Sequence, residues 1–410
     1  MDLKMDIMKK RWLILVASCF VTLCVGSLYA WSVFASPMAQ YLTELTGKEI
    51  ASLAIVFTVA NSVGPITMIS GGFINDRIGP RWVLVCAGIL FGAGMIGSGF
   101  ATSVGMLIVT YGLGVGLGCG MAYGTIVSNA VKFFPDKSGF AGGLTTACYG
   151  GSSIIIPIIA NAMLQTMHVT QAFKILGAVM GCIIIASAFV IEAAPAGFTA
   201  GMKPAAGSSA SASKDMNWRE MLGQKSFYFM LLTLTCGAFA GMMIISQASP
   251  IAQQMMGFTP ASAAAVVSLL ALFNMLGRLA SGALSDRLGA LGTMRLTFAI
   301  SVIAGILLFF CRENTVPMFY IGLAMAGFGF GSIMGIYPGF TAKQFGRKYN
   351  SVNYGIMFIG FALAGVLGPM IMNFLKNATG RYQPAFLVAA ALAVVGEVLI
   401  ALLSALERKK

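Results

Sequence analysis

Twelve long apolar runs constrain this chain more than any other feature of its sequence. A helix crosses the hydrocarbon core of a bilayer with about 20 apolar residues, and each run reaches that length. Because 58% of the 410 residues are apolar and only 10% are charged, a water-soluble fold would lack the polar residues to cover its surface. The runs are continuous rather than alternating, which predicts an all-α membrane protein instead of a barrel. The predicted spans are 12–34, 49–74, 81–101, 105–131, 138–163, 170–192, 226–256, 260–285, 292–311, 317–341, 351–375 and 384–406.

The basic residues between these runs predict the orientation of the chain. If both termini are cytoplasmic, the cytoplasmic segments hold 20 Lys and Arg residues and the opposite segments hold 5. Such a bias is typical of an integral multi-pass protein of the cell membrane, the inner membrane in a bacterium. The net charge of +13 does not indicate nucleic-acid binding, because the cations lie in short segments rather than on one face with stacking aromatic residues. The remaining cation, Arg278, lies inside a span.

One long polar segment, 193–225, divides the runs into two sets of six. It is rich in Ala, Gly and Ser between Ala205 and Ser213, a composition typical of a flexible linker. The sequence therefore predicts an N-terminal six-helix half at 1–192, a cytoplasmic linker at 193–225 and a C-terminal six-helix half at 226–410.

The two halves carry matching motifs at a nearly constant spacing of 210 to 213 residues. Each half has an even number of spans, so both halves point the same way. A parallel repeat of this kind is typical of alternating-access carriers. Glycines at every fourth position of the fourth span favour close approach of helix backbones, either for plain packing or for sliding. The matched positions are 35–40 with 248–253, Gly72–Gly79 with Gly282–Gly289, Gly116–Gly124 with Gly327–Gly335, and Pro157 with Pro369.

The chain offers little material for catalysis. Its eight cysteines lie in or beside apolar runs without the spacing of a metal or redox site, and His168 is its one histidine. No nucleophile, metal cluster or acid–base pair is arranged within the spans, so we expect neither an enzyme nor a resident cofactor or metal. His168 lies at the outer end of two spans, where we expect an interface residue rather than a proton relay.

Arg278 is the residue that the charge pattern singles out for function. It lies eight residues before Asp286, about 12 Å of helix from the end of its span. A charge at this depth is costly unless it is paired or in contact with water, and such residues usually serve function. Polar or small residues accompany it at three- and four-residue steps, which predicts a water-facing side of the helix. This stripe consists of Ala271, Asn274, Arg278, Ser281 and Ser285.

The guanidinium of Arg278 suits a carboxylate ligand. Asn274, four residues earlier, is neutral, and no acid of the same helix is placed to pair with Arg278. The planar fork of an arginine binds a carboxylate through two parallel hydrogen bonds, so the pattern favours an anion site. The alternative is that backbone carbonyls and water satisfy Arg278. Glu397, in the twelfth run, is the other deeply placed acid and a candidate for proton coupling.

Aromatic side chains in other spans are candidates for the rest of the pocket. Each of them, taken alone, is as well explained by helix packing. Together with one cation they would form a small, largely apolar pocket for a short organic anion. The candidate substrate-binding residues are Arg278, Asn274, Leu28, Tyr29, Tyr123, Tyr149, Phe330, Tyr337 and Phe358.

Two short loops carry a resemblance to a known family. The segment Gly72–Arg81 contains an Asp-Arg-x-Gly pattern, and a second copy follows Gly282. Both resemble the signature loop of the major facilitator superfamily, in which an acid and bases pair across the cytoplasmic ends of neighbouring helices. The alternative is a solvated turn that merely follows the charge bias. The gating residues that the resemblance implies are Asp76, Arg77, Asp286 and Arg287.

Further motifs resemble one branch of that superfamily, the oxalate/formate antiporters, and more distantly the monocarboxylate transporters. The resemblance covers nearly the whole chain and implies twelve helices in two parallel six-helix halves. These motifs are Tyr29–Pro37, Phe134–Lys137, Tyr149–Gly150, Asn274 with Arg278, and Asn353–Gly355.

Two departures from these relatives bear on the substrate. By resemblance, oxalate carriers hold a dianion between an arginine on the eighth helix and a lysine on the eleventh, but Phe361 stands at the lysine position here. Animal monocarboxylate transporters place an aspartate four residues before the arginine and a lysine on the first helix, whereas this chain has Asn274 and the segment Trp31–Ser32. One cation neutralises one carboxylate. We therefore expect a carrier of short monocarboxylates such as lactate, pyruvate, acetate or formate, with proton symport favoured by family analogy.

Other functions stay open on sequence alone. They are organic-anion exchange of the oxalate/formate type, transport of another small substrate such as a sugar or drug by the same fold, and a channel. A channel would show non-saturable flux and would not need duplicated gating loops. The expected partners are a small organic anion, a proton and the lipid bilayer, without nucleic acid.

Overall fold

The computed structural model describes residues 2–50, 52–195, 198 and 215–408, and these residues form helices and turns without a strand. Twelve helical segments among them are long and apolar enough to cross a membrane, which confirms the all-α fold predicted from hydropathy. The segments are Met8–Thr46, Ala54–Ile78, Pro80–Ser98, Val104–Phe133, Ser138–Leu164, Val169–Val190, Lys225–Met256, Ser262–Leu288, Ala290–Phe310, Val316–Phe345, Asn350–Thr379 and Gln383–Arg408.

The chain forms two compact units, each described here by itself. Unit 1 comprises Met1–Phe134, Cys148–Gly201 and Lys348–Ile356, and unit 2 comprises Pro135–Ala147, Met202–Arg347 and Met357–Lys410. Each unit thus contains one short segment from the other half of the sequence. The predicted halves at 1–192 and 226–410 describe the repeat and stay a prediction. Most of the predicted linker at 193–225 lies outside the described residues.

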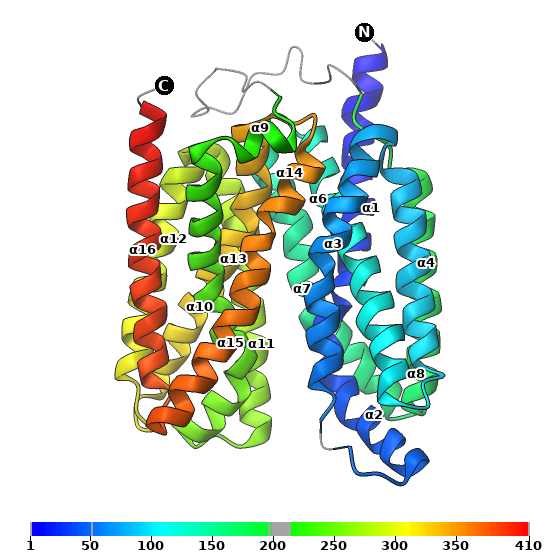
Figure 1. Cartoon of the computed structure of the whole chain (residues 1–410), viewed down its shortest axis with the longest axis vertical. Coiled ribbons are helices and arrows are strands. Elements are labelled where there is room, and N and C mark those ends of the chain that lie inside the picture. The colour runs from blue at the N-terminus through cyan, green and yellow to red at the C-terminus, as the bar shows by residue number, and fades with distance from the viewer. Residues whose placement is uncertain (1, 51, 196–197, 199–214, 409–410) are drawn as a thin grey trace. The chain divides into compact units, whose positions relative to one another are not determined.

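Unit 1 is a helical bundle in which α3 packs on α6, and α4 packs on α6 and α8 (Figure 1). The second half of the chain contributes nearly all of α14 to this unit. The fourth span combines a short α-helix, a π-helical segment and a longer α-helix. The elements are α1 (Asp2–Val25), η1 (Gly26–Ala30), α2 (Trp31–Thr46), α3 (Ala54–Ile78), α4 (Pro80–Ser98), α5 (Val104–Leu107), η2 (Ile108–Val115), α6 (Gly116–Phe133), α7 (Ser138–Leu164) and α8 (Val169–Val190).

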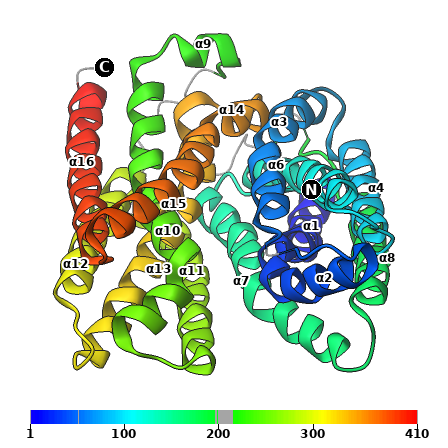
Figure 2. The same cartoon turned by 60° about the horizontal axis from the view of Figure 1, so that its bottom comes forward.

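Unit 2 repeats this arrangement, with α11 on α13 and α12 on α13 and α16, while α10 packs on α15 and α16 (Figure 2). The start of α7 completes it. The elements are α9 (Trp218–Leu222), α10 (Lys225–Met256), α11 (Pro260–Leu288), α12 (Ala290–Phe310), α13 (Val316–Phe345), α14 (Asn350–Met357), α15 (Ile359–Thr379) and α16 (Gln383–Arg408).

Glycine contacts at matched positions show that the sequence repeat is also a repeat of helix packing. In unit 1, a Cβ atom on Gly120 would overlap the backbone of Gly64, so α6 and α3 touch backbone to backbone. In unit 2, a Cβ atom on Gly331 would overlap the backbone of Asn274 in the same way. Only a residue without a side chain permits this approach.

The first span is longer than predicted. The prediction that it ends at residue 34 is wrong, because the helical path continues through α2 to Thr46. The extension is amphipathic: α2 buries Trp31, Phe34, Met38 and Leu42 at helical spacing, and most of its other positions are polar or small. A search for continuous apolar runs does not detect such a helix.

Candidate functional site

Arg278 lies in the interior of unit 2, on α11. Its side chain is 1% exposed, and it is among the largest fully buried side chains in the described part of the chain. Other helices approach its backbone closely, because a Cβ atom on Gly143 of α7 or Gly335 of α13 would overlap the Arg278 carbonyl oxygen. This packing fixes the position of the helix turn that carries the guanidinium.

Two neutral oxygens orient the guanidinium. Its Nε atom donates to Oδ1 of Asn274 at 3.0 Å, and Nη1 donates to the carbonyl oxygen of Thr146 at 3.2 Å. The sequence left open the alternative that backbone carbonyls satisfy Arg278, and the bond to Thr146 is a contact of this kind. Because both acceptors are neutral, these bonds align the cation without cancelling its charge.

A stack of phenylalanine rings lies beside the guanidinium. The Cζ atom of Arg278 is 5.8 Å from the ring centroid of Phe330, within cation–π range. The ring of Phe361 stacks on Phe330 at 6.3 Å and on Phe358 at 4.5 Å between centroids. The position at which the resemblance implies a lysine therefore extends an apolar wall. Phe358 itself occupies the break between α14 and α15.

The remaining candidate in unit 2, Tyr337, takes part in helix packing. It is buried, and its hydroxyl group donates to the carbonyl oxygen of Met230 on α10 at 2.7 Å. This bond ties α13 to α10.

Four candidates lie in unit 1, where the structure brings three tyrosines together. The rings of Tyr29 and Tyr123 pack against Tyr149, with centroids 5.4 and 4.8 Å away. The Tyr149 hydroxyl lies 3.7 Å from the Cys119 sulfur, and Leu28 is buried in η1. A role of this group in binding stays a prediction.

The water-facing side predicted for α11 is wrong for this structure. Asn274, Ser281 and Ser285 are buried together with Arg278. The Ser281 hydroxyl donates to Ser332 of α13 at 2.5 Å, while that of Ser285 bonds within its own helix. Glycines of α13 and of the first turns of α7 let these backbones cover the stripe. Periodicity identified the polar face, but the covering helices are remote in sequence.

Arg278 is also not alone inside a span. The count of basic residues assigns Arg295 to a cytoplasmic segment, although the predicted span 292–311 includes it, and α12 contains it. Its Nε atom lies 3.8 Å from Oε1 of Glu397 on α16, so the second deeply placed acid has a basic neighbour. Both side chains are partly exposed.

The two acids of the predicted gating loops lie at helix N-termini. Asp286 accepts hydrogen bonds from the backbone N–H groups of Gly139 and Phe140, at 2.9 and 2.8 Å, in the first turn of α7. Asp76 accepts from the backbone N–H group of Val352, at 3.2 Å, in the first turn of α14. Each carboxylate satisfies donors that the helix leaves unpaired and complements the positive end of the helix dipole.

Lysines of neighbouring helices provide the bases at these sites. Lys132 of α6 lies 2.6 Å from Asp76, and Lys343 of α13 lies 3.2 Å from Asp286. Sequence reasoning missed both lysines, although they stand 211 residues apart and thus match in the repeat. The repeat spacing of 211 residues could have identified these two lysines from the sequence.

The loop arginines Arg77 and Arg287 lie outside these pairs. Both are exposed, and no hydrogen bond or ion pair joins either side chain to another described residue. Each follows its acid by one position, so its side chain points about 100° away around the helix.

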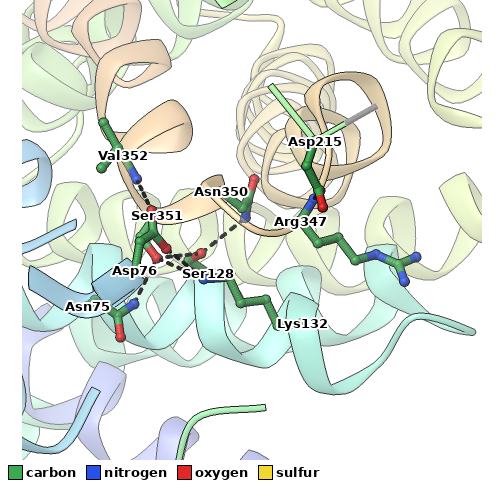
Figure 3. A network of polar contacts seen from close by, with 9 residues as sticks. All are labelled: Asn75, Asp76, Ser128, Lys132, Asp215, Arg347, Asn350, Ser351 and Val352. Atoms are coloured by element: carbon green, nitrogen blue, oxygen red, sulfur yellow. Dashed lines mark hydrogen bonds and ion pairs between the residues drawn. The ribbon is translucent and has the colours of Figure 1, made fainter. Parts of the chain in front are cut away.

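In unit 1 a polar network surrounds the Asp76 contact (Figure 3). Asn75 donates to the Ser351 hydroxyl at 2.8 Å, and that hydroxyl donates to Ser128 at 3.0 Å. Asn350 also donates to Ser128, at 3.2 Å. These bonds fasten the first turn of α14 to α3 and α6.

In unit 2 Arg347 anchors the residues that precede α9 (Figure 3). Its backbone N–H group donates to Oδ1 of Asp215 at 2.9 Å, and its Nη2 atom donates to the Pro135 carbonyl at 3.0 Å. Burial lowers the pKa of Arg347, while the carboxylates of Asp136 and Asp215 act to raise it.

Comparison with known proteins gives one family and several distant relatives. A sequence model of the Major Facilitator Superfamily matches residues 15–369. The oxalate:formate antiporter of Oxalobacter formigenes is 29% identical over 382 residues, which cover 93% of this chain and 88% of that protein. Monocarboxylate transporter 12 of Xenopus laevis is 21% identical, with 97% and 90% covered. The crystal structure of the E. coli fucose:proton symporter matches with a TM-score of 0.70 at 16% identity over 95% of this chain and 97% of that one, which shows a common fold.

Proposed function

This chain belongs to the major facilitator superfamily, and from that premise we propose that it carries short monocarboxylates across the membrane. The observation that carries the proposal is the buried guanidinium of Arg278, held in place by Asn274 beside the phenylalanine stack. A fixed cation next to apolar rings matches a ligand with one carboxylate and a short hydrocarbon part.

Arg278 is proposed to bind the carboxylate, and Asn274 to position Arg278. Because Asn274 engages Nε, the outer edge of the guanidinium keeps a constant direction. A guanidinium edge with a fixed direction can bind a planar carboxylate through two hydrogen bonds, whereas the ammonium group of a lysine acts as a point charge. The bond to the Thr146 carbonyl is one that an incoming anion would replace or share.

The rings of Phe330, Phe358 and Phe361 favour a monocarboxylate over a dicarboxylate. A second carboxylate near them would lose its hydration without gaining a cation at position 361. Lactate, pyruvate, acetate and formate each carry a single carboxylate and so avoid this cost.

Substrate binding is proposed to favour alternating access because it neutralises a buried charge. Moving helices around an unneutralised buried cation costs free energy. A bound anion lowers this cost in every conformation in which it stays bound to Arg278. Proton symport is the coupling we propose, by analogy with monocarboxylate transporters. Exchange of two organic anions is the second candidate, supported by the 29% identity to an oxalate:formate antiporter.

Uptake of labelled lactate and pyruvate into proteoliposomes tests the proposal. We expect saturable uptake that an inward-acid gradient accelerates in the wild-type protein. Arg278→Ala should abolish it, while Arg381→Ala, which removes an exposed arginine, should not. Acceleration by internal anion without a gradient effect would select exchange, and uptake by Arg278→Ala at the wild-type rate would reject the proposal.

A further inference from the structure

A pair of opposite charges lies on the outer face of unit 2. The side chains of Arg295 and Glu397 are 47% and 42% exposed, although both belong to membrane-spanning helices. The helices α12 and α16 lie side by side (Figures 1 and 2). Exposed apolar side chains are close to the pair in sequence: Leu296 follows Arg295, and Val394 and Val398 lie within three residues of Glu397. Lipid acyl chains suit these neighbours, but they offer no polar contact to the two charges.

The ion pair does not use all the hydrogen-bonding groups of Arg295 and Glu397. The Nε atom of Arg295 lies 3.8 Å from Oε1 of Glu397, which is longer than a charge-assisted hydrogen bond. Its Nη2 atom donates to the Ser404 hydroxyl at 3.3 Å. Oε2 of Glu397 is buried and receives no hydrogen bond from the described residues. A half turn about the last side-chain bond exchanges the two carboxylate oxygens, so either can face outward.

The depth of Arg295 fits a lipid headgroup. Arg295 is the sixth residue of α12, about 8 Å of helix from its start at Ala290. An arginine at that depth reaches the headgroup region by extending its apolar stem along the surface. A phosphate group can therefore meet the guanidinium while the acyl chains stay in the hydrocarbon layer.

We propose that Arg295 and Glu397 bind the headgroup of a phospholipid with a primary amine, of the phosphatidylethanolamine type. The lipid phosphate meets the guanidinium of Arg295, and the primary ammonium group donates to Glu397. The site carries one positive and one negative charge, which is the complement of a zwitterion. A primary ammonium has N–H donors for the carboxylate, whereas the quaternary ammonium of a choline lipid has none.

Native mass spectrometry of the intact purified protein tests the site with three lipids of identical acyl chains. The lipids are phosphatidylethanolamine, phosphatidylcholine and phosphatidylglycerol. We expect phosphatidylethanolamine to bind about tenfold more tightly than phosphatidylcholine, the value of one hydrogen bond to a charged group. Phosphatidylglycerol should bind less tightly than phosphatidylethanolamine, because it lacks an ammonium group and meets the negative charge of Glu397.

Two variants assign the headgroup contacts. Glu397→Gln should reduce the affinity for phosphatidylethanolamine to that for phosphatidylcholine, whereas Arg295→Gln should weaken both lipids. Arg381→Gln, an exposed arginine elsewhere on unit 2, should change neither. If Arg295→Gln does not fold, Arg295→Lys keeps the charge and should retain the preference between the lipids. Equal binding of the first two lipids, a preference for phosphatidylglycerol, or an unchanged preference in Glu397→Gln would each overturn the proposal.

Discussion

Arg278 donates a hydrogen bond from Nε to Oδ1 of Asn274, one turn earlier on α11, at 3.0 Å. Their counterparts in the first half of the chain, 210 residues earlier, are Met68 and Gly64. The helix contact is the same in both units, since Gly120 meets Gly64 as a glycine of α13 meets Asn274. The duplicated framework therefore carries a hydrogen-bonded arginine in one copy only, and that difference marks Arg278 and Asn274 as specialised.

A carboxylate at position 274 should compete with the substrate for Arg278. Asn274→Asp places an acid four residues before the arginine, where the two form an ion pair. We expect pyruvate exchange at neutral pH to fall about tenfold, which corresponds to roughly 1.4 kcal/mol. Protonation of the new acid removes the competing negative charge, so exchange should recover in acidic buffer.

Counterflow measurements with equal pH on both sides check this prediction, because they remove the driving effect of a proton gradient. Asn274→Ala is the matched control and should show no such recovery in acid. An Asn274→Asp protein that exchanges pyruvate like the wild type at every pH would contradict the proposed role of the pair.

A cation at position 361 should shift selectivity towards dicarboxylates. Phe361→Lys places an ammonium group within the phenylalanine stack, where a second carboxylate then finds a partner. We expect oxalate to inhibit lactate uptake at least tenfold more strongly in this variant than in the wild type, on the order of 1.4 kcal/mol. Phe361→Leu, which keeps the site apolar, should not respond to oxalate in this way.

The acid at the end of α11 should stabilise unit 2. Asp286 receives two backbone hydrogen bonds from α7 and pairs with Lys343, so Asp286→Asn should cost about 1–3 kcal/mol. Thermal unfolding in detergent should show a melting temperature lower by several degrees. Arg287→Gln, at the exposed neighbouring position, should change the stability by less than about 0.5 kcal/mol. Equal effects of the two substitutions would contradict the capping role.

The glycine contact beside Asn274 should be intolerant of a methyl group. In Gly331→Ala the new Cβ atom overlaps the Asn274 backbone, which forces α11 and α13 apart and displaces the Arg278 pair. We expect lower thermal stability and reduced lactate uptake. Gly292→Ala is the control, because its new Cβ atom would lie 3.9 Å from the nearest atom, the Cβ of Leu288, and would overlap nothing. A Gly331→Ala protein with wild-type uptake would show that the exact spacing of these helices does not matter for transport.

Hydropathy predicted the twelve spans because burial in a bilayer requires long apolar runs whatever the tertiary packing. The extension of the first span to Thr46 escaped prediction, since α2 has only one apolar face. The loop motif predicted the acids Asp76 and Asp286, but it could not name Lys132 and Lys343, whose positions depend on neighbouring helices. The polar stripe on α11 was visible as a pattern, whereas its burial results from glycines on two other helices. Local chemistry is thus readable from the sequence, and the partner across a helix contact requires the structure.

Ligand-induced thermal stabilisation tests the central claim most directly when acids are compared with their neutral amides. Lactate and lactamide have similar size and shape, but only lactate carries the charge that Arg278 is proposed to bind. We predict that lactate raises the melting temperature of the wild-type protein, that lactamide does not, and that Arg278→Gln responds to neither. Equal stabilisation by lactate and lactamide, or a full lactate response in Arg278→Gln, would contradict the account.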